Sequence, residues 1–218
     1  MEDIKYWVAF HRVSGIGPAT FTKLEARFGD LESAWCAPVS DLIAAGVRPK
    51  VAAESDRFRD NNEPDEVMGT LDRLDIQALH LRHPDYPARL AETPMAPSVI
   101  YLRSNTGMLL QADEQAIAVV GSRDATPYGF GMTRRLSYDL ARAGVTIVSG
   151  LARGIDSAAH KADLEAGGRT IAVLGSGLDR IYPQRSIPLA DKIVQSGALL
   201  TEYPPGVSAL PQHFPRRN

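Results

Sequence analysis

Two apolar segments that each end in a turn of small residues constrain the fold of this chain most. The first, residues 117–120, ends at Gly121-Ser122-Arg123, and the second, residues 145–148, ends at Ser149-Gly150. Unalternating apolar strands separated by a helical stretch are typical of a parallel sheet, which binds ligands outside the carboxyl ends of its strands. An arginine in such a turn predicts an anion site, and so a phosphate-bearing partner.

The alternation of strand and helix continues toward the C-terminus. Further strands are predicted at Thr170–Leu174 and Ala198–Thr201. One helix between the strands presents three apolar residues at helical spacing: Phe130, Leu136 and Leu140. A second helix begins at Asp156 or Ser157, either of which can cap it, and a third spans residues 188–195. We therefore predict an α/β fold, with a Rossmann-like parallel sheet over residues 114–218.

The N-terminal part reads differently. Residues 1–61 suggest a small all-α domain that resembles SAM-like and helix-hairpin-helix domains, with a Gly15-Ile16-Gly17 turn. That turn is either a DNA phosphate contact or a purely structural connection in which glycine permits left-handed dihedrals. Residues 62–113 form a proline-rich connector, whose short strands at 76–79 and 99–102 are expected to pack on the main sheet.

Several classes of site and location are disfavoured. The glycine pattern for a dinucleotide and the Walker loop are both absent, so neither NAD binding nor ATP hydrolysis has support. Cys36 is the only cysteine and the five histidines are scattered, so no metal and no cofactor are predicted. The net charge of −2 gives no global signal for nucleic acid. Without a signal pattern or a membrane span, a cytoplasmic location is expected.

The ordered motifs resemble the DNA-processing protein A family (DprA, also called Smf) over nearly the whole chain. The segments that carry the resemblance are residues 83–90, 121–123, 149–156, 159–160, 170–179, 182–183, 201–206 and 214–218. The resemblance implies a protein that is not an enzyme, binds single-stranded DNA and loads the RecA recombinase onto it in natural transformation. It also implies a homodimer.

The resemblance places the DNA pocket at the strand ends and at the Phe-Pro segment. The DNA-binding candidates are Gly121, Ser122, Arg123, Gly150, Arg153, Phe214, Arg216 and Arg217. Arg123 suits a phosphate, and the glycines allow close approach of the backbone. Phe214 either stacks on a base or is a core aromatic. Arg153 either contacts DNA or braces its turn by an ion pair with Asp156. No catalytic residue is assigned.

Two departures from the family pattern stand out. Pro211 and Gln212 occupy a place where many relatives carry a lysine, which puts that basic contact in doubt. The sequence also ends at Asn218, inside a motif that the family continues. The dimer contacts and the RecA-facing surface are therefore expected beyond Asn218, and a chain that ends there is expected to be poorly stable.

Two other functions remain open on the sequence. The early strands also resemble lysine-decarboxylase-like phosphoribohydrolases, which cleave nucleoside monophosphates with a Pro-Gly-Gly loop and a glutamate. No such loop occurs in the 218 residues. The third interpretation is a scaffold in which the strand-end turns are only structural. Release of adenine from AMP would indicate the enzyme, and retention on oligo-dT would argue against the scaffold.

Overall fold

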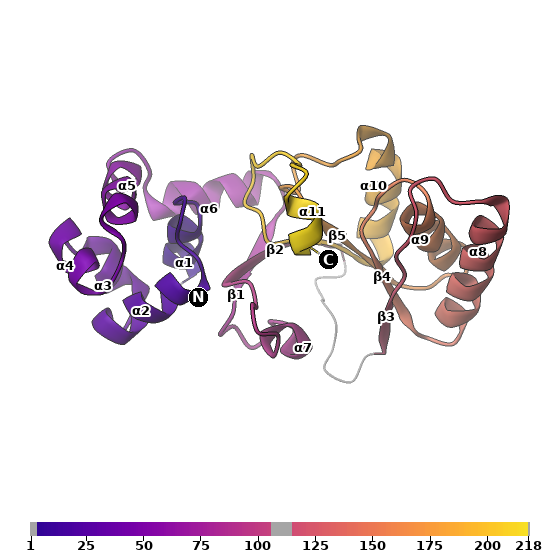
Figure 1. Ribbon diagram of the computed structural model, residues 1–218, viewed down its shortest axis with the longest axis horizontal. Coiled ribbons are helices and arrows are strands. Elements are labelled where there is room, and N and C mark those ends of the chain that lie inside the picture. The colour runs from indigo at the N-terminus through magenta and orange to yellow at the C-terminus, as the bar shows by residue number, and fades with distance from the viewer. Residues whose placement is uncertain (1–3, 106–114, 218) are drawn as a thin grey trace. The chain divides into compact units, whose positions relative to one another are not determined.

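The computed structural model describes residues 4–105 and 115–217. The chain divides into two compact units, Met1–Ile100 and Tyr101–Asn218 (Figure 1). The division into three segments at residues 61 and 113 stays a prediction. None of the helices within the described ranges combines the length and the apolar character that crossing a bilayer requires.

The first unit is helical up to residue 73. Its helices are α1 (Ile4–His11), α2 (Pro18–Phe28), α3 (Leu31–Cys36), α4 (Val39–Ala44), α5 (Pro49–Arg59) and α6 (Pro64–Arg73). They enclose an apolar core in which Trp7 stacks on Phe21 with ring centroids 4.8 Å apart. Strand β1 (Gln77–His80), helix α7 (Ala88–Ala91) and the first residues of β2 (Val99–Arg103) complete the unit.

The turn between α1 and α2 is built for packing. Gly15 has a φ of 91°, which disfavours any side chain, and an added Cβ would lie 2.8 Å from a Val51 methyl group. Packing within the helical unit therefore accounts for Gly15. This geometry supports the structural interpretation of the turn over the DNA contact.

The sheet is six-stranded and mixed, in the order β1-β2-β6-β5-β4-β3. Strands β3 (Ala116–Ala118), β4 (Thr146–Ser149), β5 (Thr170–Leu174) and β6 (Ala198–Thr201) run parallel. Strand β2 pairs antiparallel with β6, with Tyr101 opposite Thr201. The α/β fold is thus confirmed, and β2 adds an antiparallel partner to the predicted parallel strands.

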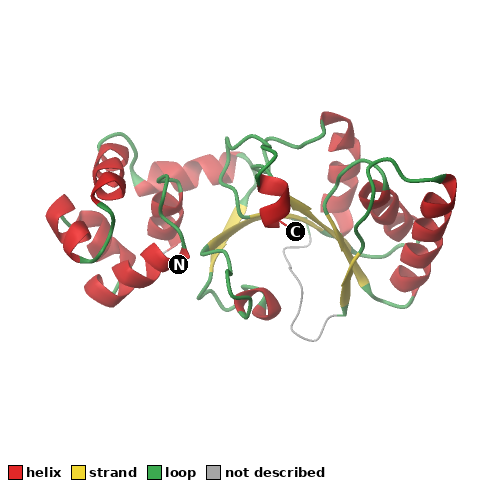
Figure 2. Cartoon of the chain, in the orientation of Figure 1, coloured by secondary structure: helices red, strands yellow, loops and turns green. Residues whose placement is uncertain are grey.

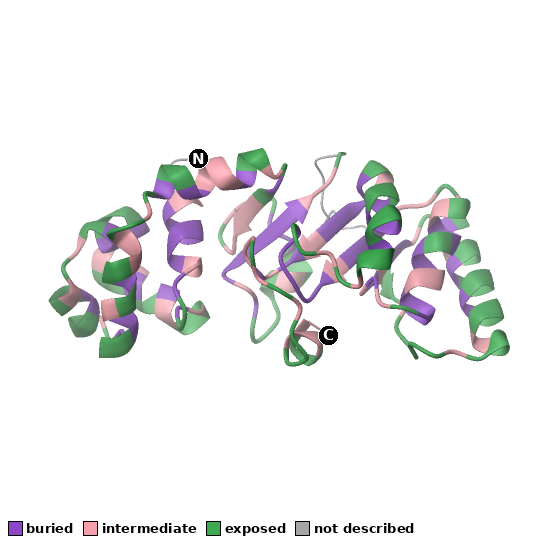
Figure 3. Cartoon of the chain, turned by 90° about the horizontal axis from the view of Figure 1, so that it is seen from above, coloured by how far each residue is buried: buried purple, intermediate pink, exposed green. Residues whose placement is uncertain are grey.

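The second unit covers one face of its sheet with the crossover helices α8 (Pro127–Arg142), α9 (Ile155–Glu165) and α10 (Ile187–Ser196) (Figure 2). A 3₁₀ turn, Gln184–Ser186, precedes α10, and the short helix α11 (His213–Arg217) ends the described chain. In Figure 3 the central strands are largely buried, and the helices turn their exposed residues to solvent.

Helix α8 differs from its predicted packing. The helix is present, but its buried residues are small: Thr133, Ser137 and Ala141. Phe130 and Leu136 are 41% and 54% exposed. Small side chains let α8 approach α9 closely, so its larger apolar residues Phe130 and Leu136 are not buried in that contact.

The start of α9 also departs from prediction. Gly154, with φ 90°, occupies the N-cap position, and neither Asp156 nor Ser157 caps the helix. Asp156 instead accepts a hydrogen bond from the Gly150 N–H at 3.1 Å, and Ser157 Oγ donates to the Ala152 carbonyl. The turn after β3 supplies the missing acceptor, because the Ile155 N–H donates to the Ser122 carbonyl at 3.2 Å.

Two titratable side chains of α9 are buried against the sheet. His160 places Nδ1 2.7 Å from Thr170 Oγ1, while its Nε2 has no hydrogen-bond partner. The Asp163 carboxylate lies near the Ile147 N–H without a well-formed hydrogen bond. Burial raises the pKa of Asp163 to about 7 and lowers the pKa of His160 to about 3. Both groups are therefore neutral at mildly acidic pH.

Candidate functional site

The Gly-Ser-Arg turn after β3 rests directly on the start of α9. A Cβ added at Gly121 would lie 2.7 Å from Ile155, and one added at Gly154 would overlap the Ser122 carbonyl oxygen. Only glycine permits this approach at either place. The turn is further closed by the Asp124 N–H, which donates to Ser122 Oγ at 3.1 Å. The interlocked backbone leaves the side chain of Arg123 exposed.

Arg123 lies against an aromatic pair. Its guanidinium carbon is 5.2 Å from the centroid of the Phe214 ring, within the range of a cation–π contact. The Phe214 ring is tilted by 42° to that of Tyr182, with centroids 6.0 Å apart. Phe214 is half-buried and Tyr182 is 53% exposed. Phe214 thus belongs to a surface cluster with Arg123 and Tyr182, and not to the core.

Arg217 holds the last helix on the sheet. Its Nη1 donates to the Gly150 carbonyl at 3.0 Å and to the Val173 carbonyl at 2.8 Å. A Cβ on Gly150 would overlap this guanidinium, so the glycine makes room for Arg217. Burial lowers the pKa of Arg217. The structure therefore places Arg217 and Gly150 in a tie between the ends of β4 and β5, and their contact with DNA stays a prediction.

A second tie seats α11. His213 Nδ1 lies 3.0 Å from the Gly175 carbonyl oxygen, which suits an Nδ1–H donor. The His213 ring stacks on Tyr203, with centroids 4.1 Å apart and planes at 19°. The Phe214 ring lies beside Gly175, where an added Cβ would come within 3.2 Å of Cδ1. The position of Phe214 is thus fixed from the carboxyl end of β5.

The two remaining arginine candidates are ion-paired. Arg153 pairs with Asp124, so the alternative in which it braces its turn through Asp156 is wrong, and its contact with DNA stays a prediction. Asp156 is buried and already accepts from Gly150, whereas Asp124 lies in the turn that contacts the start of α9. Arg216 pairs with Glu202 at 3.0 Å. Both arginines remain partly exposed, at 48% and 57% of their side-chain surface.

Sequence reasoning missed one member of the cluster. Tyr182 lies within a segment that carries the family resemblance, yet nothing in its immediate neighbours predicts a contact with Phe214, 32 residues later. Within residues 4–105 and 115–217, no three His, Cys, Asp or Glu side chains gather closely enough to hold a metal ion. The arrangement offers cations and aromatic faces, which suit phosphates and bases.

Known proteins share this sequence and fold. Residues 77–218 match the family described as DNA recombination-mediator protein A. Protein Smf of Synechocystis is 38% identical over 218 residues, 98% of this chain and 54% of that protein. The DNA processing protein DprA of Bacillus subtilis is 36% identical over 152 residues, 70% of this chain and 50% of that protein. The chain thus spans about half the length of these relatives.

Two solved structures are similar as well. The X-ray structure of DNA processing protein A from Streptococcus pneumoniae has a TM-score of 0.77 at 30% identity, and covers 98% of this chain and 72% of that one. A structure of DNA processing protein A from Helicobacter pylori, described for its single-stranded DNA binding mode, has a TM-score of 0.57 at 29% identity. It covers 65% of this chain and 62% of that one. By sequence and by fold, this chain belongs to the DNA recombination-mediator protein A family.

Proposed function

We propose that this chain binds single-stranded DNA at the strand ends of its second unit. The observation that carries the proposal is that Arg123 has no carboxylate partner among the described residues. Arg153 and Arg216 each have a carboxylate partner, whereas Arg123 lies against Phe214, whose ring in turn lies beside Tyr182. An uncompensated guanidinium in a cluster with two aromatic rings matches the alternation of phosphate and base in a single strand.

The proposed mechanism is binding without chemistry. Arg123 takes a phosphate oxygen, while Phe214 and Tyr182 offer their faces to neighbouring bases. Stacking is sequence-tolerant because every base has a π-face, so the site takes DNA of any sequence. The cation–π contact holds Arg123 and Phe214 together before DNA arrives, which lowers the ordering cost of binding. The strand-end residues only hold the DNA in place, and we propose no enzymatic reaction for them.

The relatives support this assignment. The Helicobacter pylori protein that shares the fold was described for binding single-stranded DNA. Loading of the RecA recombinase in natural transformation, and the homodimer that the resemblance implies, are proposed for the whole protein. This chain spans about half the length of the curated relatives that it matches, so those partners are not assigned to its own surface.

Arg123→Ala should weaken binding of oligo-dT by about tenfold or more, because a charge-assisted hydrogen bond contributes about 1.5–3 kcal/mol. The slope of log K against log salt should fall by about 0.7, the value for one phosphate on a single strand. Fluorescence anisotropy across a salt series measures both. Arg142→Ala, which removes an exposed arginine at the end of α8, is the matched control and should change neither. Unaltered affinity in a folded Arg123→Ala protein would rule out this role.

Phe214→Leu should lower the affinity for oligo-dT while the melting temperature stays nearly constant. Leucine keeps most of the apolar volume but removes the π-face, whose stacking contributes about 1–3 kcal/mol per base. The side chain is only half-buried, so little folding energy depends on it. Anisotropy and thermal melting on the same preparation separate the two effects. A large fall in melting temperature with normal affinity would make Phe214 a structural residue.

A further inference from the structure

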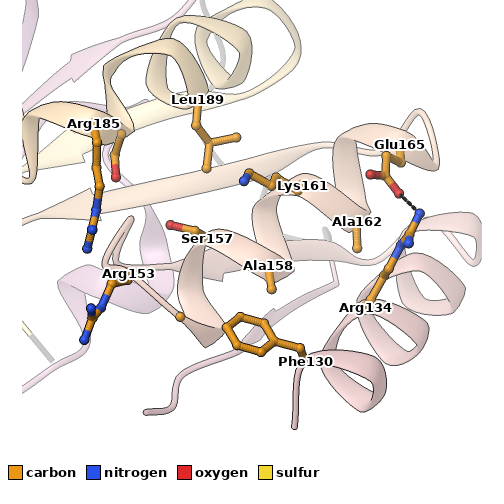
Figure 4. Close-up of a pocket in the computed structure, with 12 residues that line it drawn as sticks. Phe130, Arg134, Arg153, Ser157, Ala158, Lys161, Ala162, Glu165, Arg185 and Leu189 are labelled. Atoms are coloured by element: carbon orange, nitrogen blue, oxygen red, sulfur yellow. Dashed lines mark hydrogen bonds and ion pairs between the residues drawn. The ribbon is translucent and has the colours of Figure 1, made fainter. Parts of the chain in front are cut away.

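A groove with basic walls lies between α8, α9 and α10, and has a volume of about 520 Å³ (Figure 4). We call it the basic groove, and its defining residues are Phe130, Arg134, Arg153, Lys161, Arg185 and Leu189. Ala158 and Ala162 of α9 also line it, and their small side chains leave the space open. The groove can therefore accept part of a ligand.

The charge of the basic groove is not balanced. It is lined by four cationic side chains and by one carboxylate, Glu165, which pairs with Arg134 at 2.9 Å. Arg153 is paired with Asp124. Lys161 and Arg185 are exposed and have no carboxylate partner among the described residues. Two uncompensated cations along one groove favour an anionic ligand with more than one charge.

An aromatic face accompanies these charges. The Phe130 ring lies beside Ala158 at the side of the groove opposite Leu189, and 41% of Phe130 is exposed (Figure 4). The groove thus combines an exposed phenylalanine with unpaired cations, the same kinds of side chain that meet at Arg123 and Phe214. A nucleotide unit, with one phosphate and one base, satisfies both kinds of group.

Two lining residues of the basic groove, Arg153 and Gly154, contact the turn of the strand-end site. Arg153 lines the groove and also pairs with Asp124, the residue that follows Arg123. Gly154, another lining residue, packs beneath the backbone of Ser122 and Arg123. Arg185 and Arg153 lie at the same end of the groove in Figure 4. Arg153 therefore lies between the Gly-Ser-Arg turn and the rest of the groove.

We infer that the basic groove is a second binding segment for the same DNA strand. Phosphates contact Lys161 and Arg185, a base lies against Phe130, and Arg153 joins the groove to the strand-end site. The inference rests on the proposed function and extends its footprint to the helical layer. The contact of Arg153 with both the groove and the strand-end turn favours DNA over an acidic peptide, which the same charges would also attract.

Oligonucleotide length separates the two sites. Single-strand binding modules have site sizes of about 4–16 nucleotides. We therefore expect an oligo-dT at the short end of this range, about 4 nucleotides, to fill the strand-end site alone, and one of about 16 nucleotides to reach the groove as well. Lys161→Ala/Arg185→Ala should leave the affinity for the short oligonucleotide unchanged. It should weaken binding of the long one by about tenfold and reduce its salt slope by about 1.4, the value for two phosphates. Anisotropy with labelled oligonucleotides measures both.

The matched control is Arg142→Ala/Lys192→Ala, which removes the same charge from α8 and α10 outside the groove. It should bind both oligonucleotides normally. If Lys161→Ala/Arg185→Ala binds the long oligonucleotide normally while Arg123→Ala does not, the basic groove is not a second binding segment and the proposed function stands. Equal weakening of both lengths also overturns it. A wild-type chain that binds neither removes the proposed function itself. Binding of oligo-glutamate is measured as well. If Lys161→Ala/Arg185→Ala loses binding of oligo-glutamate but keeps binding of oligo-dT, the groove binds acidic peptides and the inference is wrong.

Discussion

Asp163→Asn should raise the free energy of unfolding at pH 8 by up to about 4 kcal/mol, at about 1.4 kcal/mol per unit of pKa shift. The wild-type carboxylate is buried without a well-formed hydrogen bond, and burial raises its pKa from 3.8 to about 7. At pH 8 the folded protein must therefore hold a charge in its core. Asparagine is nearly the same shape and removes that charge.

The pH dependence gives the sharper signature. The contribution of Asp163 is fully present below its unfolded pKa of 3.8, and is lost as the pH rises through about 7. His160 acts in the opposite sense, because burial lowers its pKa from 6.5 to about 3. Its contribution is present above pH 6.5 and is lost as the pH falls toward 3. Between about pH 4 and 6.5 the two slopes cancel in the wild type.

Asp163→Asn should therefore become less stable as the pH falls from 6.5 to 4, while the wild type changes little from this pair. Urea unfolding at pH 4.5, 6.5 and 8 measures the difference. Asp191→Asn, at an exposed position of α10, is the matched control and should follow the wild type. Parallel curves for wild type and Asp163→Asn would show that Asp163 is not neutralised by burial.

Gly154→Ala should destabilise the second unit by at least about 3 kcal/mol and abolish binding of oligo-dT. The residue has φ 90°, where a side chain is strained, and its Cβ would overlap the Ser122 carbonyl oxygen. Relief requires the Gly-Ser-Arg turn to leave the start of α9. Arg123 then loses its place beside Phe214, so stability and binding fall together.

Gly167→Ala separates the strain of a positive φ from the steric overlap with a neighbouring backbone. Gly167 follows the other end of α9 with φ 73°, but an added Cβ there meets nothing within 4 Å. This control variant has the conformational strain alone. It should lower the free energy of unfolding by about 1–2 kcal/mol and leave DNA binding unchanged. Thermal melting and anisotropy measure both variants. Normal oligo-dT binding by Gly154→Ala would show that the turn need not be held against α9.

The strands were the predictable part of the fold, and the helix faces were not. The apolar runs Thr170–Leu174 and Ala198–Thr201 are β5 and β6 as predicted, because each is buried within the sheet. Strand β3 was predicted at 117–120 and lies at Ala116–Ala118, since an edge strand pairs on one side only. In α8 the periodicity identified the helix, but its buried face is set by the close approach of α9.

In the candidate site, too, some contacts could be predicted from the sequence and others depend on the tertiary structure. The family resemblance brought Arg123 and Phe214 into one hypothesis, and the structure places the Arg123 guanidinium carbon 5.2 Å from the centroid of the Phe214 ring. For Arg153, the alternative of an ion pair with Asp156 was wrong, because its pairing with Asp124 depends on how two turns meet across 29 residues of sequence. The acceptors of Arg217 are backbone carbonyls at the ends of β4 and β5. Carbonyl acceptors carry no residue-type signal, so no sequence pattern predicts them.

Helix α11 carries both Arg217, which holds it on the sheet, and Phe214, for which we propose stacking on a base. Arg217 ties it to the Gly150 and Val173 carbonyls, while Phe214 leans on Arg123. A DNA strand that contacts both Arg123 and Phe214 binds only molecules in which α11 is docked on the sheet. Its apparent affinity is therefore the intrinsic affinity multiplied by the fraction of molecules with α11 docked. By reciprocity, bound DNA shifts α11 toward the docked state. In the proposed function, bound single-stranded DNA therefore stabilises the contact between α11 and the sheet.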